Sequence, residues 1–209
     1  MQKLLDGIVH FRRSDFDSHK ELFQQLSSEQ KPHTLFITCS DSRVDPCLIT
    51  KALPGELFIV RNIANLVPPY REAEEFLSTT AAIEYAVNAL EVEQIIVCGH
   101  SNCGGCSAAL HPEKVSQHLP HTQKWIELSA PVTKRVHEEF STEQASAKEW
   151  IMEQLNVIEQ VKHLLSYPYI KTRVQNGKLA LSGWYYIIET GEIFIYDKEE
   201  SAFVLANDL

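Results

Sequence analysis

The chain has 209 residues, of which 44% are hydrophobic and 22% are charged; this is the composition of a globular chain and excludes a disordered one. The 28 acidic and 19 basic residues leave a formal net charge of −9, which argues against binding to nucleic acid or to an anionic membrane surface through bulk charge. An anionic substrate would therefore need a local positive centre.

The cysteines are odd in number, and the first ten residues of the chain lack the long apolar run of a signal peptide. Both features argue against a disulfide framework and favour a cytoplasmic protein, whose thiols serve as packing residues, nucleophiles or metal ligands. No run of 18 apolar residues occurs, so we expect no transmembrane helix. The five cysteines are Cys39, Cys47, Cys98, Cys103 and Cys106.

Short apolar runs alternate with segments of helical periodicity, which predicts βαβ units. In chain order the predicted elements are a helix over 14–28, strands over 33–38 and 56–60, a helix over 77–90, a strand over 94–99, a helix from Cys103, a helix over 144–165, and strands over 179–188 and 192–196. The turn 189–192 between the last two strands predicts a hairpin. The sequence therefore predicts an α/β fold with a mostly parallel, four-stranded central sheet, an added antiparallel edge strand and flanking helices.

Two short motifs follow predicted strands of this sheet. Cys39-Ser-Asp-Ser-Arg43 follows the first strand, and His100-Ser-Asn-Cys103 follows the third. Ligands bind at the carboxyl ends of the strands in such sheets. Two thiolates and one imidazole suit the tetrahedral preference of zinc, with the fourth position open to water in a catalytic site or filled by a protein ligand in a structural one.

Asp41 is the residue that could fill the fourth position, and Arg43 is placed to prevent it. Both side chains are expected on one side of an extended segment, where a bidentate carboxylate–guanidinium pair can form. We hypothesise that Arg43 keeps the fourth coordination position of the metal open by holding Asp41. Low pH should favour the closed form, in which Asp41 is the fourth ligand.

Other interpretations of the cysteines stay open at this point. Cys103 and Cys106 could form a redox dithiol, or Cys106 could replace Cys39 as a metal ligand. Cys47 and Cys98 are expected to be buried packing residues.

These motifs and three further segments resemble the β-class carbonic anhydrases, above all the plant-type branch with its bacterial and cyanobacterial relatives. The resemblance is dense over 30–106 and extends to Tyr167-Pro-Tyr169 and Ser182-Gly-Trp184. It is carried by Cys-Ser-Asp-Ser-Arg (39–43), Pro-Gly-Glu-Leu-Phe-Ile-Val-Arg-Asn-Ile-Ala-Asn (54–65), Val-Pro-Pro-Tyr (67–70), Ala-Ala-Ile-Glu-Tyr-Ala-Val (81–87) and Gly-His-Ser-Asn-Cys-Gly-Gly (99–105).

The resemblance implies a zinc enzyme that reversibly hydrates carbon dioxide to bicarbonate and a proton through zinc-bound hydroxide. It implies Zn²⁺ on Cys39, His100 and Cys103 and a catalytic dyad of Asp41 and Arg43. The implied substrate-binding residues are Gln30, Phe58, Ile63 and Tyr85, which would line the carbon dioxide pocket, and Gly104, whose backbone amide would help to hold bicarbonate.

The resemblance also implies a homodimer as the minimum unit, with tetramers or larger assemblies built from it. The chain would be a single domain over 1–209, with a helical dimerisation arm (1–30), a zinc-site α/β core (31–110) and C-terminal helices with the edge hairpin (111–209). The arm would embrace the neighbour, so that Gln30, Phe58 and Tyr85 serve the partner's zinc. The resemblance is compatible with a cytoplasmic protein or with carboxysomal or organellar association.

Three alternatives and one departure complete the sequence-based picture. The same fold could hydrolyse carbon disulfide or carbonyl sulfide, a closed zinc centre could be purely structural, and a Cys103/Cys106 redox pair would need no zinc. Another branch of the family carries a tryptophan and a glycine where this chain has Phe36 and Thr38, which argues against that branch's regulatory bicarbonate site.

Overall fold

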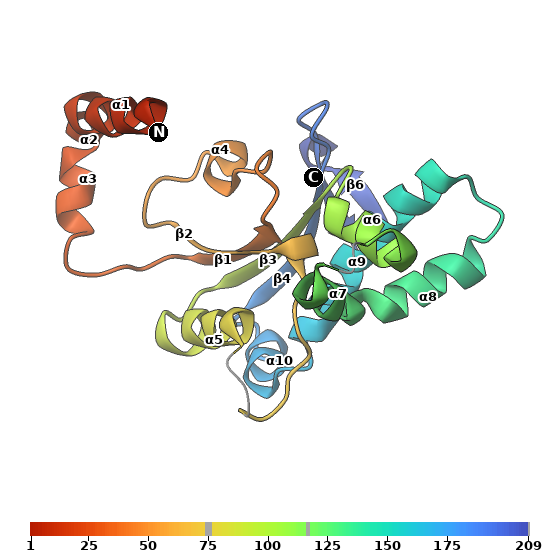
Figure 1. Ribbon diagram of the computed structural model, residues 1–209. Coiled ribbons are helices and arrows are strands. Elements are labelled where there is room, and N and C mark those ends of the chain that lie inside the picture. Colours follow the sequence, from red (N-terminus) through yellow and green to blue (C-terminus); the bar gives the residue numbers. More distant parts are fainter. Residues whose placement is uncertain (74–76, 116–117, 209) are drawn as a thin grey trace.

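The computed structural model describes residues 1–73, 77–115 and 118–208, and its centre is a six-stranded sheet of order β2-β1-β3-β4-β5-β6 (Figure 1). The first four strands of that order are parallel, and β5 and β6 continue the sheet antiparallel. The strands are β1 (Thr34–Cys39), β2 (Leu57–Asn62), β3 (Gln94–His100), β4 (Ala180–Tyr186), β5 (Ile193–Asp197) and β6 (Ala202–Leu205).

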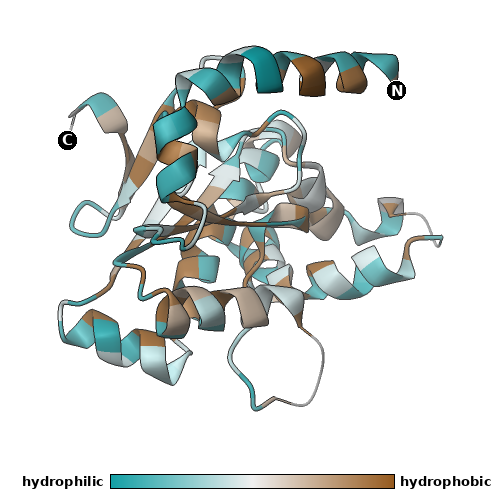
Figure 2. Ribbon diagram, turned by 90° about the vertical axis from the view of Figure 1, so that its left-hand side faces the viewer, coloured by the Kyte–Doolittle hydropathy of each residue, from teal (hydrophilic) through white to brown (hydrophobic). Residues whose placement is uncertain are grey.

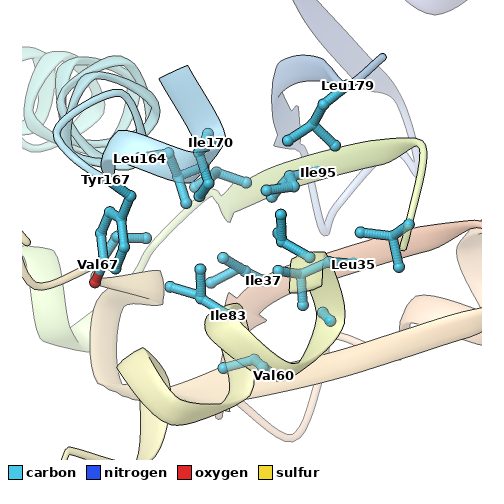
Figure 3. Packing of buried hydrophobic residues seen from close by; sticks show 14 of the residues in the cluster. Leu35, Ile37, Val60, Val67, Ile83, Ile95, Leu164, Tyr167, Ile170 and Leu179 are labelled. Carbon is cyan, nitrogen blue, oxygen red and sulfur yellow. The ribbon is translucent and has the colours of Figure 1, made fainter. Parts of the chain in front are cut away.

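The inner strands are apolar because both faces of the sheet are covered. Leu35 and Ile37 of β1 pack on one face with Val60, Ile83, Ile95 and Leu164 (Figure 3). Phe36 points to the opposite face, where it packs edge-to-face on Trp184 at a centroid distance of 5.8 Å. This alternation follows from the two-residue period of a strand.

The helical residues Ile83, Leu164 and Ile170 pack on the sheet face of Leu35 and Ile37, and Ile49 packs on the face of Phe36. The first helices of the chain stand apart from the sheet (Figure 1). The helices are α1 (Gln2–His10), α2 (Phe16–Ser18), α3 (Lys20–Gln25), α4 (Pro46–Thr50), α5 (Ser78–Glu84), α6 (Gly104–Leu110), α7 (Pro120–Ile126), α8 (Ala130–Glu139), α9 (Ala145–Leu164) and α10 (Pro168–Gln175). None of the helices in the described ranges combines the length and the apolar character needed to cross a membrane.

The N-terminal helices form an arm with little contact to the rest of the chain (Figures 1 and 2). None of the residues of α1 is buried. The arm is held together by the rings of Phe11, Phe16 and Phe23, of which Phe16 and Phe23 stack at 5.3 Å. Its helical structure begins at Gln2, well before the helix that the sequence predicts over 14–28.

The α/β fold with four parallel central strands confirms the sequence-based prediction, and the antiparallel edge contains one strand more. The hairpin of β4 and β5 forms as predicted, and β6 then pairs with β5. β6 was not predicted because it has only four residues, too few to show an alternating pattern.

Helix α9 packs closely against β3 and β4 because each strand has a glycine beneath it. A Cβ atom on Gly99 would lie 2.5 Å from Cγ2 of Val157, and a Cβ atom on Gly183 would lie 2.9 Å from its Cγ1. Real Cβ atoms do not approach other atoms this closely, so side chains at these positions would push α9 away from the sheet.

We therefore expect Gly99→Ala to lower the free energy of unfolding by about 1–3 kcal/mol through overpacking, measured by urea denaturation. Adding Val157→Ala should recover part of this loss, because the extra methyl group then has room. Gly7→Ala, whose Cβ atom would meet nothing within 4 Å, is the matched control. Equal stability of Gly99→Ala and Gly7→Ala would contradict the close approach.

Candidate active site

The ends of two neighbouring strands bring the predicted metal ligands together. Cys39 is the last residue of β1 and His100 the last of β3, and these strands are paired in parallel. Asn102, in the left-handed conformation with φ 54°, then turns the chain so that Cys103 caps α6. The ligand atoms of the two cysteines and the histidine lie within 4.8 Å of one another, with 4.0 Å between the two Sγ atoms.

The imidazole of His100 is oriented as a ligand. Its Nδ1 donates a hydrogen bond to the carbonyl oxygen of Ser101 at 3.0 Å, which leaves Nε2 without a proton. This Nε2 is buried and has no hydrogen-bond partner among the described residues. A zinc ion would satisfy this unpaired buried nitrogen beside the two thiols. A histidine that binds zinc commonly donates its other N–H to a carbonyl, as His100 does here.

The two thiols are costly to ionise without a cation. The hydrogen bond with Cys103 and burial raise the pKa of Cys39 to about 12. The pKa of Cys103 is raised by a hydrogen bond with Cys106 and by burial. A bound divalent cation reverses this effect, because it stabilises the thiolates directly. The donor set therefore fits zinc.

Beside this cluster, Arg43 holds Asp41 in a bidentate pair. Arg43 donates from Nη2 to Oδ2 at 2.7 Å and from Nε to Oδ1 at 3.0 Å. These bonds hold the pKa of the Asp41 carboxyl well below its usual range. We expected an extended segment here, but the chain forms a turn in which Val44 N–H donates to the Asp41 carbonyl. Within this turn Arg43 N–H donates to Asp41 Oδ1 at 2.9 Å. The turn therefore holds the side chains of Asp41 and Arg43 in position to pair.

Arg43 and Arg61 tie this turn to the two ligand-bearing segments. Arg43 Nη2 also donates to the carbonyl of Asn102 at 3.0 Å. Arg61 donates to the carbonyls of Cys39 at 3.1 Å and Asp41 at 2.7 Å. The role of Arg61 was not predicted, although its place after the second predicted strand puts it at the same sheet edge.

A cavity of about 730 Å³ opens on the cluster. Its walls include Cys39 and Asp41 together with two of the predicted substrate-binding residues, Ile63 and Gly104. Gly104 is the first residue of α6, where the backbone N–H has no partner within the helix.

The other three predicted substrate-binding residues do not line this cavity. Gln30 is exposed after the arm. The rings of Phe58 and Tyr85 lie 6.0 Å apart, with Phe58 against the sheet core and Tyr85 half exposed. Part of the predicted site thus lies outside the cavity that a single chain forms at its own metal ligands.

Helix α9 supports the site with a carboxylate that the sequence did not reveal. Glu153 is buried and accepts hydrogen bonds from Cys103 N–H at 2.7 Å and from the Tyr185 hydroxyl at 2.6 Å. Burial raises the pKa of this carboxyl. In the sequence Glu153 is one of several acidic residues of an amphipathic helix, so no signal distinguished it.

The remaining cysteines lie outside the cluster, and none of the five forms a disulfide. Cys98 and Cys106 are buried, as expected of Cys98, whereas Cys47 is only half-buried. Cys106 packs in the core near the cluster and accepts a hydrogen bond from Asn156 Nδ2 at 3.7 Å. The geometry gives it a packing role rather than that of a replacement ligand for Cys39.

We expect Glu153→Ala to destabilise the zinc-loaded protein, because it leaves the Cys103 N–H and the Tyr185 hydroxyl buried without an acceptor, at about 1–3 kcal/mol each. Urea denaturation measures the loss. Tyr185→Phe should cost less, since the bond to Cys103 remains.

The control for this prediction is Glu138→Ala on α8. Glu138 lies 3.9 Å from Lys134, both side chains are exposed, and such pairs contribute less than about 1 kcal/mol. A Glu153→Ala protein as stable as this control would show that Glu153 does not support the cluster.

Comparison with known proteins agrees with the fold and the site. The family model described as carbonic anhydrase matches residues 34–193. A carbonic anhydrase of Helicobacter pylori (strain J99) is 42% identical over 94% of this chain and 90% of its own length. A carbonic anhydrase of Synechocystis is 43% identical over 94% of this chain and 71% of its own length.

Solved structures give the same result. The β-carbonic anhydrase CcaA superposes with a TM-score of 0.94 at 42% identity over 98% of both chains. A tetrameric β-carbonic anhydrase of Sordaria macrospora superposes with a TM-score of 0.81 at 30% identity, over 93% of this chain and 95% of that one. The chain therefore belongs to the β-carbonic anhydrase family of enzymes.

Proposed function

We propose that the protein is a zinc-dependent carbonic anhydrase that converts carbon dioxide and water to bicarbonate and a proton, and the reverse. The observation that carries the proposal is that a buried Cys39–His100–Cys103 cluster and the Asp41–Arg43 pair face one cavity. Thiolate and imidazole ligands with a free fourth position are typical of catalytic zinc.

The three ligands would hold Zn²⁺, which when bound lowers the pKa of water toward neutrality and so supplies a nucleophile. Asp41 Oδ2 lies 3.9 Å from His100 Nε2, which puts a carboxylate beside the ligands to accept a hydrogen bond and orient the attack. Arg43 keeps that carboxylate ionised and, by binding both of its oxygens, would keep it from becoming the fourth zinc ligand.

Carbon dioxide is uncharged, so the cavity needs an apolar wall and donors for the oxygens that become negative. Ile63 supplies part of this wall. The backbone N–H of Gly104, which has no partner within α6, would donate to an oxygen as charge develops on it.

The proposal includes a homodimer in which the arm packs on a second copy. Helix α1 exposes Leu4 and Ile8 on one helical face, with Leu5 and Val9 beside them, and Phe11 continues this face directly after the helix. An exposed apolar face of this size, with no partner in the part of the chain that the structure describes, is typical of an interface. Gln30, Phe58 and Tyr85 would complete the second copy's cavity. The five free thiols support a cytoplasmic location.

Substitutions in the site separate metal binding from chemistry. We expect Cys39→Ser and His100→Ala to lose zinc and carbon dioxide hydration together. Asp41→Ala should retain zinc and lose activity by a factor on the order of 10²–10⁴, the contribution of a positioned acid–base group. Stopped-flow hydration with and without a zinc chelator, and metal analysis of each variant, measure these outcomes.

Cys47→Ser is the control, because Cys47 lies outside the cluster, and it should keep both zinc and rate. Asp41→Ala at the wild-type rate would refute the role of the pair. A zinc-loaded wild type without hydration activity would instead favour a structural metal centre, and turnover of carbon disulfide in its place would favour the hydrolase alternative.

Charged substitutions on the apolar face of α1 test whether the arm forms the dimer. We expect Leu5→Glu with Ile8→Glu to give monomers with a lower hydration rate, because the burial that stabilises the dimer is lost; sedimentation velocity at low micromolar concentration measures this. Lys3→Glu with Asp6→Asn changes the polar residues of the same helix and should remain dimeric. Fully active monomers of the wild type would contradict the shared site.

A further inference from the structure

Each hydration releases one proton inside the cavity, and the groups next to the cluster are poorly suited to carry it away. Both carboxylate oxygens of Asp41 accept hydrogen bonds from Arg43, which ties this carboxylate in place beside the cluster. A carrier should titrate near neutral pH and should connect the cavity to solvent.

His111 is an imidazole whose position fits this task. It lines the same cavity as Cys39 and Asp41, and its side chain is 23% exposed. Among the described residues that line this cavity, it is the one whose ordinary pKa lies near neutral. His121 lines a neighbouring cavity with Arg61 and Trp125 instead.

Helix α6 carries the histidine at a fixed distance from the cluster. Cys103, Ser107 and His111 are spaced four residues apart, and backbone bonds join them: Ser107 N–H donates to Cys103 and His111 N–H donates to Ser107. They therefore share one face of the helix. Eight residues at about 1.5 Å each place His111 about 12 Å along the helix axis from Cys103, so a proton would travel through cavity water.

Two carboxylates face the imidazole from other elements. Glu113 Oε1 lies 3.6 Å from Nδ1, and Glu149 Oε1 on α9 lies 3.9 Å from Nε2. Ser107, which also lines the cavity, donates to the same Glu149 oxygen at 3.0 Å. The polar groups thus continue from the cavity wall to the histidine.

We propose that His111 is the proton-transfer residue of this enzyme, with Glu149 as its positioning residue. The inference rests on the proposed function. In hydration the imidazole takes the proton released into cavity water and passes it to a base in solution, and it returns to its neutral form. In dehydration the same proton moves inward.

The first test separates proton transfer from chemistry. In His111→Ala, kcat in weak buffer should fall about tenfold or more, within the range of general acid–base effects, whereas kcat/KM should stay at the wild-type value. Added imidazole buffer should restore kcat. Glu149→Gln should lower kcat less. His137→Ala, on α8 and outside this cavity, is the matched control and should behave as the wild type.

The second test does not depend on turnover. The imidazole signals of His111, assigned by their loss in His111→Ala, should shift in the zinc-loaded protein when azide is added, because His111 lines the cavity that the anion enters. Glu149→Gln should move these signals, because it replaces the carboxylate that lies 3.9 Å from the imidazole.

Two results would overturn the inference. One is a kcat for His111→Ala equal to the wild type in weak buffer, and the other is an equal loss of kcat and kcat/KM without rescue by imidazole. Failure of the proposed function is distinct from both, because the zinc-loaded wild type would then hydrate no carbon dioxide at all.

Discussion

The pairing of β1 with β3 is the constraint on which the site depends. These strands are far apart in the sequence, yet they lie in parallel register, Thr38 opposite Cys98. Parallel strands that end at one edge deliver the residues after them to one place, here Cys39 and His100. The third ligand then needs only a short turn, from His100 to Cys103. One strand pair thus brings together two ligands that are far apart in the sequence, Cys39 and His100, and the third, Cys103, is close to His100 in the sequence.

Helix α9 fixes the loops that this pairing leaves at the sheet edge. Its buried polar residues Glu153, Asn156 and Gln160 follow one helical face and bond to backbone, not to solvent. Glu153 holds Cys103 N–H, Asn156 donates to the Ala64 carbonyl at 2.9 Å, and Gln160 accepts from Val67 N–H at 2.8 Å.

These bonds are needed because the loops contain residues in the left-handed conformation. Ala64, with φ 61°, and Asn102, with φ 54°, are not glycines, and such backbone persists only where the surroundings stabilise it. The wall residue Ile63 is next to one of them and Cys103 is next to the other. The cavity shape and the metal site therefore depend on polar side chains of a helix that contributes no ligand.

This division explains what the sequence could predict. The ligand motifs and the parallel strands are encoded locally, by residue type, spacing and apolar runs, and these gave the cluster and the four central strands. The bonds of Glu153 and Asn156 join residues far apart in the sequence, and polar residues in an amphipathic helix give no sign that they are buried. Gln30, Phe58 and Tyr85 follow from the resemblance alone, since a single chain leaves them away from the cavity.

The same helix that completes the metal cluster also sets the position of the residue proposed to exchange protons. Cys103 caps α6 at one end and His111 follows it at the other, so the distance between them is fixed by regular helical geometry and not by a loop. Glu153 and Glu149 anchor the two ends of α6 to one helix, α9, through Cys103 and through Ser107 and His111. Metal binding and proton exchange would then depend on the same packed pair of helices, and a shift of α6 against α9 would disturb both.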